Sequence, residues 1–213
     1  MILLEKSEVW GFEHAIRGMR NPLNSWARSD SHWIDDESEE RSYEVGENDA
    51  ELMTKLIRGG APHRKFLRQI FVSVDITAPL YWWKEFDTYK VGTVANSTST
   101  MHKIHAKPIE MGDFSFDHLT PASKEAAEKF VDYIESVRLK YLENKEKEYW
   151  YDLIQLLPSS YNQMRTVTMN YENLSNMYYA RRAHKLDEWH TFCDFIKELP
   201  YADVMIMTKE EEQ

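Results

Sequence analysis

A short polar run from Gly92 to Thr100 holds the side chains best suited to binding a small molecule. It reads GTVANSTST and is rich in hydroxyl and amide groups. Such groups compete with the backbone for hydrogen bonds, so we predict a loop here and not more helix. An aromatic helix is predicted just before it, over Leu80–Phe86, opened by Ala78-Pro79 because proline suits a first helical turn. The run therefore predicts either a binding loop or a simple connector.

Arg181 and Lys185 are the second chemical signal. They interrupt an otherwise apolar stripe on a helix that the spacing predicts from about residue 171 to 197. Either this face opens on solvent or it meets an anion. Arginine suits phosphate binding because its fork can donate two parallel hydrogen bonds, so a functional and a solvated Arg181 are both open.

Three further signals predict structure more readily than chemistry. His102 and His105 have a metal-ligand spacing, but no third ligand is evident near them, and we predict no metal site. Cys193 lies inside a predicted helix and is expected to be a buried small hydrophobe, not a nucleophile. Arg17 and Arg20 share one face of a predicted helix, and we favour a solvated basic edge over a specific role.

The composition predicts one folded domain over residues 1–213. Aromatic residues make up 13% of the chain, which excludes general disorder. The formal charge of −10 argues against sequence-independent binding to nucleic acid, which needs cations against phosphates. No apolar run is long enough to span a membrane, and without a signal peptide we expect a cytoplasmic protein. Residues 30–48 are predicted to form a solvated loop or insertion. Their acidic run comprises Asp35, Asp36, Glu37, Glu39 and Glu40.

The remaining elements follow from periodicity and caps. Apolar residues alternate from Ile70 to Ile76, as in a strand with one buried face. Asn48 and Gly59 are predicted to bound one helix, and Thr120-Pro121 to open a long one. A strand rich in threonine and valine is predicted from Met164 to Met169. Shorter segments are predicted at residues 2–4 as a strand, and at 13–20 and 149–157 as helices.

The order of these elements, over about residues 46–198, resembles that of the flavin-dependent thymidylate synthases. Val72–Pro79 is similar to the strand that ends in Ala-Pro ahead of that family's signature motif. The second half carries several identities at fixed offsets across a strand-to-helix junction, which are hard to obtain by chance. They are Leu157, Pro158, Tyr161, Thr168, Asn170, Leu174, Asn176 and Arg181.

The signature of that family, R-H-R-x-x-S-x-N-E-x-S-x-R, falls on residues 88–100 in the ungapped register. Its residue types are largely replaced in this chain. The Arg-His-Arg triplet becomes Thr88, Tyr89 and Lys90. The final arginine becomes Thr100, and another arginine expected four residues before Pro158 becomes Ile154.

The resemblance implies an α+β fold, with an antiparallel or mixed sheet flanked by long helices, and a homotetramer that holds FAD between subunits. It implies reductive methylation of dUMP to dTMP, with methylenetetrahydrofolate and NADPH as co-substrates. No protein nucleophile is expected, because the flavin carries the chemistry while the protein orients and polarises. Carried over residue by residue, the cofactor-binding positions are Asn170, Asn176, Thr88, Tyr89 and Lys90. The nucleotide-binding positions are Arg181, Asn96, Thr98 and Thr100.

Two other hypotheses stay open at this level. The altered motif also fits a diverged protein that binds or modifies a pyrimidine nucleotide without thymidylate synthase activity. A purely structural hypothesis makes the polar run a connector and assigns nearby aromatic residues to a homo-oligomer interface. These residues are Tyr81, Trp82, Trp83 and Tyr89.

Overall fold

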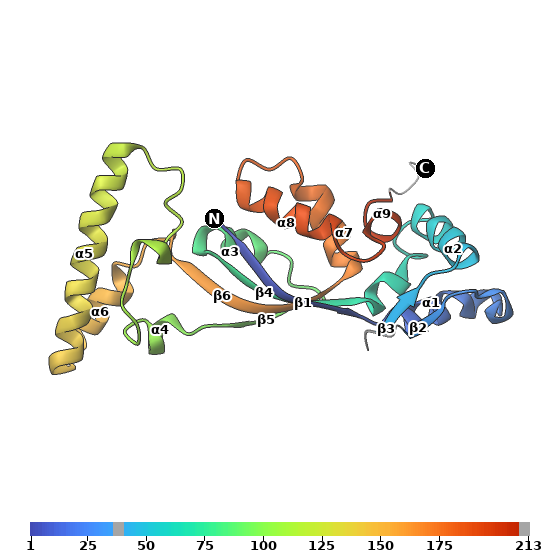
Figure 1. Ribbon diagram of the computed structural model, residues 1–213, viewed down its shortest axis with the longest axis horizontal. Coiled ribbons are helices and arrows are strands. Elements are labelled where there is room, and N and C mark those ends of the chain that lie inside the picture. The colour runs from blue at the N-terminus through green and yellow to red at the C-terminus, as the bar shows by residue number, and fades with distance from the viewer. Residues whose placement is uncertain (36–40, 209–213) are drawn as a thin grey trace. The chain divides into compact units, whose positions relative to one another are not determined.

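The computed structural model describes residues 1–35 and 41–208. Within these ranges the chain has helices and two sheets, so the predicted α+β class is confirmed (Figure 1). One sheet has four strands in the order β1-β4-β6-β5, and the other has two, β2 and β3. The strands are β1 Leu3–Trp10, β2 His32–Asp35, β3 Arg41–Glu44, β4 Phe71–Pro79, β5 Val94–Ser97 and β6 Asn162–Asn170. No helix in the described part of the chain is long and apolar enough to cross a membrane.

The two central strands of the larger sheet, β4 and β6, run antiparallel. Ser73 Oγ lies 3.2 Å from Thr168 Oγ1, and further along β4 the Asp75 carboxylate accepts a hydrogen bond of 2.5 Å from Thr166 Oγ1. Residue numbers thus fall along β6 as they rise along β4, which is the antiparallel arrangement. Alternate residues of β4 are buried, as the period-two pattern of its sequence predicts.

The chain divides into two compact units, each made of separate segments. Unit 1 comprises Met1–Glu5, Asp75–Thr88 and Ala95–Thr166; unit 2 comprises Lys6–Val74, Tyr89–Val94 and Val167–Gln213. All four strands of the larger sheet contribute residues to both units. The single domain that length predicts stays a prediction.

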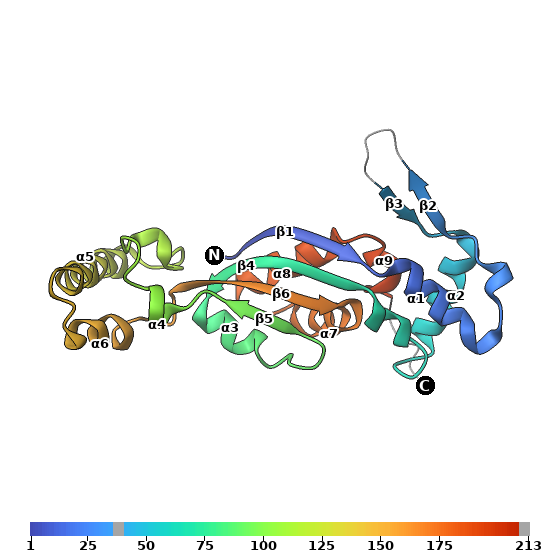
Figure 2. The ribbon, with the colours of Figure 1, turned by 90° about the horizontal axis from the view of Figure 1, so that it is seen from below.

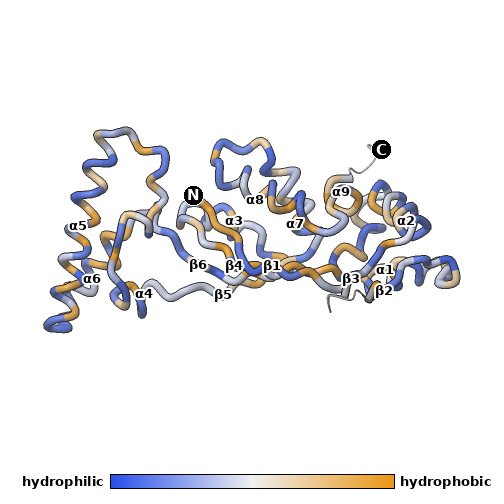
Figure 3. Tube along the Cα trace, viewed as in Figure 1, coloured by the Kyte–Doolittle hydropathy of each residue, from blue (hydrophilic) through white to orange (hydrophobic). Residues whose placement is uncertain are grey.

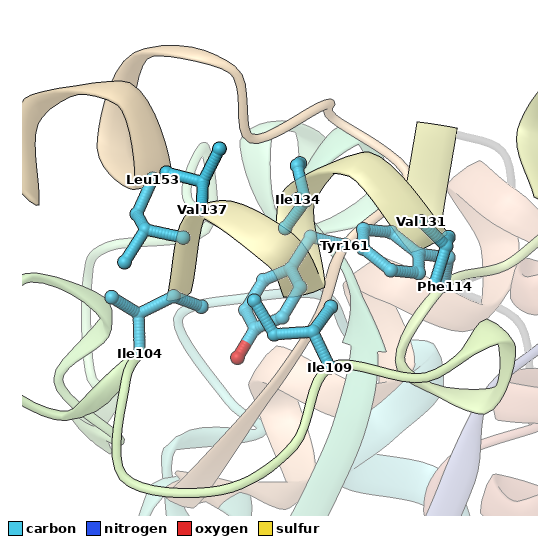
Figure 4. Packing of buried hydrophobic residues seen from close by; sticks show 8 residues of the cluster. All are labelled: Ile104, Ile109, Phe114, Val131, Ile134, Val137, Leu153 and Tyr161. Carbon is cyan, nitrogen blue, oxygen red and sulfur yellow. The ribbon is translucent and has the colours of Figure 1, made fainter. Parts of the chain in front are cut away.

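Unit 1 contains an apolar cluster around helix α5 (Pro121–Asn144). Its helices are α3 Leu80–Phe86, α4 Thr100–Lys103, η4 Met111–Asp113, α5 Pro121–Asn144 and α6 Lys147–Gln155. Helices α5 and α6 lie side by side, and α5 alternates between hydrophobic and hydrophilic residues along its length (Figures 1 and 3). The buried side of α5 packs on residues from the preceding loop and from α6 (Figure 4). The cluster comprises Ile104, Ile109, Phe114, Val131, Ile134, Val137, Leu153 and Tyr161.

Unit 2 contains the remaining helices and the β2–β3 pair. These helices are α1 Phe12–Arg20, η1 Asn21–Leu23, η2 Trp26–Arg28, α2 Glu47–Arg58, η3 Lys65–Gln69, α7 Tyr171–Arg181, α8 Asp187–Lys197 and α9 Ala202–Met205. Large side chains without exposed surface fill its core, among them Leu67, Trp189 and Phe192. Strands β2 and β3 form an antiparallel hairpin in which Trp33 lies opposite Tyr43 (Figure 2).

Several sequence predictions hold at the level of elements. The strand before Ala78-Pro79 is β4, the aromatic helix is α3 with the predicted bounds, and Thr120 caps α5 by accepting from Ser123 N. Pro79 itself is the extended N-cap of α3 and not part of its first turn.

Three local predictions are wrong. Residues 30–48 contain β2 and β3, so this segment is not simply a loop, and its alternative interpretation as an insertion stays a prediction; residues 36–40 of its acidic run lie outside the described residues. The predicted N-cap Asn48 is inside α2; instead the Asp30 carboxylate accepts from the backbone N–H groups of Asn48 and Asp49. The polar run is not all loop, because β5 and the start of α4 lie within it.

The helix predicted from 171 to 197 is two helices. Helix α7 ends at Arg181 and α8 begins at Asp187. Between them His184 N donates to Arg181 O, and His184 Nδ1 accepts from Leu186 N, so local bonds replace the helical pattern. Lys185 therefore does not interrupt an apolar stripe; it lies exposed in the turn.

Candidate functional site

Arg181 is the last residue of α7, and two aromatic rings hold its side chain. Its Nε donates to the hydroxyl of Tyr89 at 2.9 Å. The guanidinium carbon lies 4.7 Å from the centre of the Trp189 ring and 5.5 Å from that of Tyr89. Cation–π attraction and the negative end of the helix dipole both favour a cation at this position. The structure thus brings together two residues that the sequence predicted separately, Arg181 and Tyr89.

The segment that carries Tyr89 is also fastened to the first turn of α7. Asn173 Nδ2 donates to the carbonyl of Val91 at 2.6 Å. Gly92 adopts φ +77°, and a Cβ atom there would lie 2.8 Å from Nδ2 of Asn170 and 2.9 Å from Oδ1 of Asn173. The positive φ disfavours any L side chain here, and a Cβ atom would also force the two asparagine side chains to shift.

Asn170, a predicted flavin ligand, has a structural role in the described chain. It is buried and forms a reciprocal cap with Asn173: its Oδ1 accepts from Asn173 N at 3.0 Å, and Asn173 Oδ1 accepts from Asn170 N at 3.3 Å. This cap satisfies two backbone N–H groups at the start of α7. Asn170 therefore fixes the helix that carries Asn176 and Arg181.

Asn176 lies exposed on α7 at the edge of a pocket of about 500 Å³. Arg64 and Arg182 line this pocket together with Tyr179 and Thr208. Arg64 Nη2 donates to Asn176 Oδ1 at 3.5 Å, and Arg64 Nε lies 3.5 Å from Oε1 of Glu172. Two guanidinium groups beside an amide form a donor set that suits a phosphate-bearing cofactor. The residues present therefore fit the phosphates of a dinucleotide such as FAD.

The other predicted site residues belong to different parts of the fold. Thr88 follows α3, where its Oγ1 donates to Glu85 O at 2.7 Å; Lys90 is exposed in unit 2. Asn96 is exposed in β5, and the backbone N–H and Oγ1 of Thr98 both donate to Met164 O, at 2.9 and 3.2 Å. Thr100 is the first residue of α4. Thr88, Asn96, Thr98 and Thr100 are in unit 1, and the other five are in unit 2.

Comparison with solved structures gives extensive likeness in fold. A crystal structure of Thymidylate Synthase X from Helicobacter pylori with FAD and dUMP has a TM-score of 0.66 and 17% identity, covering 96% of each chain. A second structure of the same enzyme with FAD and dUMP has a TM-score of 0.66 and 16% identity, covering 98% of this chain and 99% of that one. A UMP/dUMP methylase, PolB from Streptomyces cacaoi bound with 5-Br UMP, has a TM-score of 0.63 and 12% identity, covering 98% and 92%.

This chain has the fold of the flavin-dependent thymidylate synthases. The resemblance seen in the sequence is thereby confirmed for the fold. No protein-family model matches the chain, and no curated protein matches it either.

Within this thymidylate synthase fold, one altered position has a clear structural reason. Ile154, which stands where the sequence comparison expects an arginine, is on α6 and packs against the apolar cluster of unit 1. A guanidinium there would have to leave the cluster or be buried in it at a desolvation cost. The position is apolar because of its surroundings.

A network of polar contacts supports the part of the polar run that belongs to unit 1. The Arg165 guanidinium carbon lies 4.2 Å from the centre of the Trp83 ring, and its Nη1 and Nε donate to Asp87 and Gln163 at 2.8 and 3.0 Å. Gln163 Nε2 in turn donates to Thr98 O at 2.9 Å. This network fixes the backbone just after β5, where Thr98 lies.

The aromatic interface hypothesis is wrong for its central pair. Trp82 and Trp83 are 0% and 1% exposed, so they are core residues. Cys193 is buried as predicted, and burial raises the pKa of its thiol to about 11, which disfavours the nucleophilic thiolate. His102 is exposed, while His105 packs edge-on against Tyr141. Among the described residues no group of acidic, histidine and cysteine side chains could hold a metal ion.

Sequence reasoning missed Arg64 and Arg182. Arg182 directly follows the predicted Arg181, so its position was a usable signal. Arg64 is 112 residues from Asn176, and no local pattern links the two. Only the folded chain brings this second cation to α7.

Proposed function

We propose that the chain is a flavin-dependent enzyme that methylates C5 of a uracil nucleotide, with conversion of dUMP to dTMP as its reaction. The structural neighbours, which were crystallised with FAD and dUMP or with 5-Br UMP, support this proposal. The observation that carries it is the arrangement along α7. This one helix presents Asn176 beside two arginines and, at its end, Arg181 against two aromatic rings.

Arg181 would bind the nucleotide phosphate. The Tyr89 hydroxyl and the Trp189 ring restrict the plane of its guanidinium. Little side-chain entropy is then lost when an oxyanion binds, which favours affinity. Asn96, Thr98 and Thr100 would contact the same nucleotide through shorter polar side chains.

Arg64, Asn176 and Arg182 would hold the phosphates of FAD, with Thr88, Tyr89 and Lys90 as further cofactor contacts. When bound, FAD supplies the hydride chemistry, with NADPH as reductant and methylenetetrahydrofolate as carbon donor. The chain itself binds and orients the reactants. We also propose a homotetramer in the cytoplasm, which light scattering of the purified protein and cell fractionation would test.

A second candidate follows from Ile154 and Thr100. Replacing two arginines by these residues removes two charge-assisted contacts, each worth about 1.5–3 kcal/mol. Nucleotide affinity would fall by roughly 10²–10⁴-fold unless other cations compensate. This loss favours a diverged protein that binds or modifies a pyrimidine nucleotide without thymidylate synthase activity. Likeness to the UMP/dUMP methylase makes UMP the first alternative substrate.

Two measurements test the proposal. The absorption spectrum of the purified chain, with and without added FAD, should show bound flavin. Flavin-loaded protein should then release tritium from C5-labelled dUMP when methylenetetrahydrofolate and NADPH are present. The same assay with C5-labelled UMP distinguishes the two substrates.

The test variant is Arg181→Ala, and its matched control is Arg28→Ala. Arg28 is an exposed arginine at the end of η2 and should not affect the reaction. Arg181→Ala should lower release at subsaturating nucleotide. Protein that binds flavin and nucleotide but never releases tritium would support the second candidate, and protein that binds neither would reject both.

A further inference from the structure

A second pocket, of about 580 Å³, lies beside α1 in unit 2 and takes no part in the proposed reaction. It is lined by one side of α1, by residues of η1 and η2, by the segment before β2 and by β3. Two arginines and two aromatic residues are among its walls: Arg17, Arg20, Trp26 and Tyr43. The two arginines are those for which the sequence favoured a solvated basic edge.

Arg20 is not solvated, because its side chain is 3% exposed and pairs with the fully buried Asp49. Its Nε donates to Asp49 Oδ1 at 2.5 Å. The other carboxylate oxygen, Oδ2, accepts from the hydroxyls of Ser29 and Ser31, both at 2.7 Å. Backbone N–H groups of Asp30 and Ser31 donate to Oδ2 as well, each at 3.1 Å. The carboxylate is therefore saturated with donors.

The guanidinium of Arg20 is less completely satisfied than the carboxylate. Its Nη1 donates to the carbonyl and hydroxyl of Ser25, at 3.3 and 3.4 Å. Its Nη2 is buried and has no hydrogen-bond partner among the described residues. Buried polar groups in proteins are nearly always paired, so this nitrogen calls for an acceptor that the described chain does not supply.

Arg17 lies one helical turn before Arg20 and is exposed. It makes no hydrogen bond or ion pair with any described residue. Glu13, the one carboxylate among the described residues of the pocket wall, accepts a hydrogen bond of 3.0 Å from Trp33 Nε1. Among the described residues Asp49 offsets the charge of Arg20, and the wall keeps one further cation, Arg17, and one further carboxylate, Glu13.

The aromatic walls add a second requirement. Trp26 is 49% exposed, and its Nε1 donates to Asn21 Oδ1 at 2.8 Å. Tyr43 is half-buried and packs edge-on against Trp33. Rings that line a pocket beside a cation favour a flat, apolar group next to a charged one.

We propose that this pocket binds a small planar molecule that carries a carboxylate or a phosphate. The oxyanion meets Arg17 and Nη2 of Arg20, and the planar group lies against Trp26 and Tyr43. Because Nη2 is buried, the side chains around it must move before an oxyanion reaches it. The site is independent of the proposed flavin and nucleotide chemistry, and its residues belong to unit 2 alone.

Titration calorimetry of the full-length chain with benzoate and with phenyl phosphate tests the proposal and distinguishes the two anions. At least one should bind saturably, whereas benzyl alcohol, which is planar but neutral, should not. Loss of one charge-assisted contact in Arg17→Ala should weaken binding about tenfold. Arg28→Ala is the matched control and should bind like the wild type. Binding should also change tryptophan fluorescence in the wild type and not in Trp26→Phe.

Three results would overturn the proposal. They are no saturable binding of either anion, equal affinity in Arg17→Ala and the wild type, and a fluorescence change that persists in Trp26→Phe. Weakening by Arg181→Ala in place of Arg17→Ala would assign the anion to the other arginine and would also reject it. Arg17 is exposed, so its substitution does not threaten folding.

Discussion

Arg20 and Arg181 both end a helix in unit 2, yet the chain holds them in opposite ways. Arg20 ends α1 and is neutralised by Asp49 in the core. Arg181 ends α7 and is held by a hydroxyl and two rings. A buried ion pair gains much of its Coulomb energy at the expense of solvation, so its main effect is to specify one structure. Arg181 instead has the rings of Tyr89 and Trp189 beside its guanidinium, and the role proposed for it is to bind an anion.

The largest expected effect is on the Arg20 side of this comparison. Asp49→Ala leaves a buried guanidinium and strips the acceptor from two serines and two backbone N–H groups. We expect the free energy of unfolding in urea to fall by about 3–5 kcal/mol. Asp132→Ala, an exposed aspartate on α5, is the control and should change it by less than about 0.5 kcal/mol. A loss below about 1 kcal/mol for Asp49→Ala would contradict the structural role of the pair.

The next effect is on the Arg181 side. Arg181→Ala should weaken dUMP binding by about 10- to 100-fold, since one charge-assisted contact is lost. It should destabilise the chain by less than about 1 kcal/mol, because the residue ends its helix and is only partly buried. Calorimetry and urea unfolding on one preparation check both. An unfolding loss as large as that of Asp49→Ala would erase the contrast between the two arginines.

Low pH should weaken the stability that Asp49, the partner of Arg20, contributes to the fold. Burial by itself raises the pKa of Asp49, but hydrogen bonds from Ser31, Ser29 and Arg20 outweigh it and leave the pKa below its ordinary value of 3.8. As the pH falls below about 4, the unfolded chain takes up this proton before the folded chain does. The contribution of Asp49 to the free energy of unfolding is therefore fully present above about pH 4. It is lost as the pH falls through the lowered pKa of the folded chain.

Ser31→Ala should flatten this acid dependence. The substitution removes a hydroxyl that donates to Asp49 and lowers the pKa of its carboxyl, and it should cost about 1 kcal/mol at neutral pH. Urea midpoints between about pH 5 and pH 2 measure the difference from the wild type. Parallel profiles for the two proteins would show that Asp49 does not control acid stability.

The smallest effect should come from Tyr89→Phe. The ring stays beside Arg181, but the hydroxyl that accepts from its Nε is lost. We expect a stability change of about 0.5–1.5 kcal/mol and a loss of dUMP affinity of less than about tenfold. Tyr178→Phe is the control, because Tyr178 lies on α7, the helix that carries Arg181. A drop as large as that of Arg181→Ala would mean that Tyr89 contacts the nucleotide itself.

Local sequence signals predicted those elements whose limits are set locally. The alternation in β4 and the Thr120-Pro121 start of α5 are examples. The break between α7 and α8 was missed, because the residues between them keep helical spacing and only their own hydrogen bonds end the helix. The strands β2 and β3 were missed because charge dominates a segment in which a Trp33–Tyr43 cross-strand contact favours pairing.

The candidate site was predictable in part. Arg181 was recognisable as a cation at an unexpected position, but its ring partners come from different segments of the chain. The burial of Arg20 was not predictable from Arg17 and Arg20 alone, since its partner Asp49 is 29 residues away and its surroundings form only on folding. Long-range partners decide which of two similar arginines is buried.

The glycine at position 92 also bears on how this protein folds. Segment 89–94 touches α7 near both ends of the helix, at Asn173 and at Arg181. These contacts join residues 82 and 92 positions apart, so they form only after a long loop has closed. We expect amide hydrogens in this segment to gain protection late in refolding, after those of α5, whose contacts are local. Any side chain at Gly92 would then delay this docking step and leave the early helices unaffected.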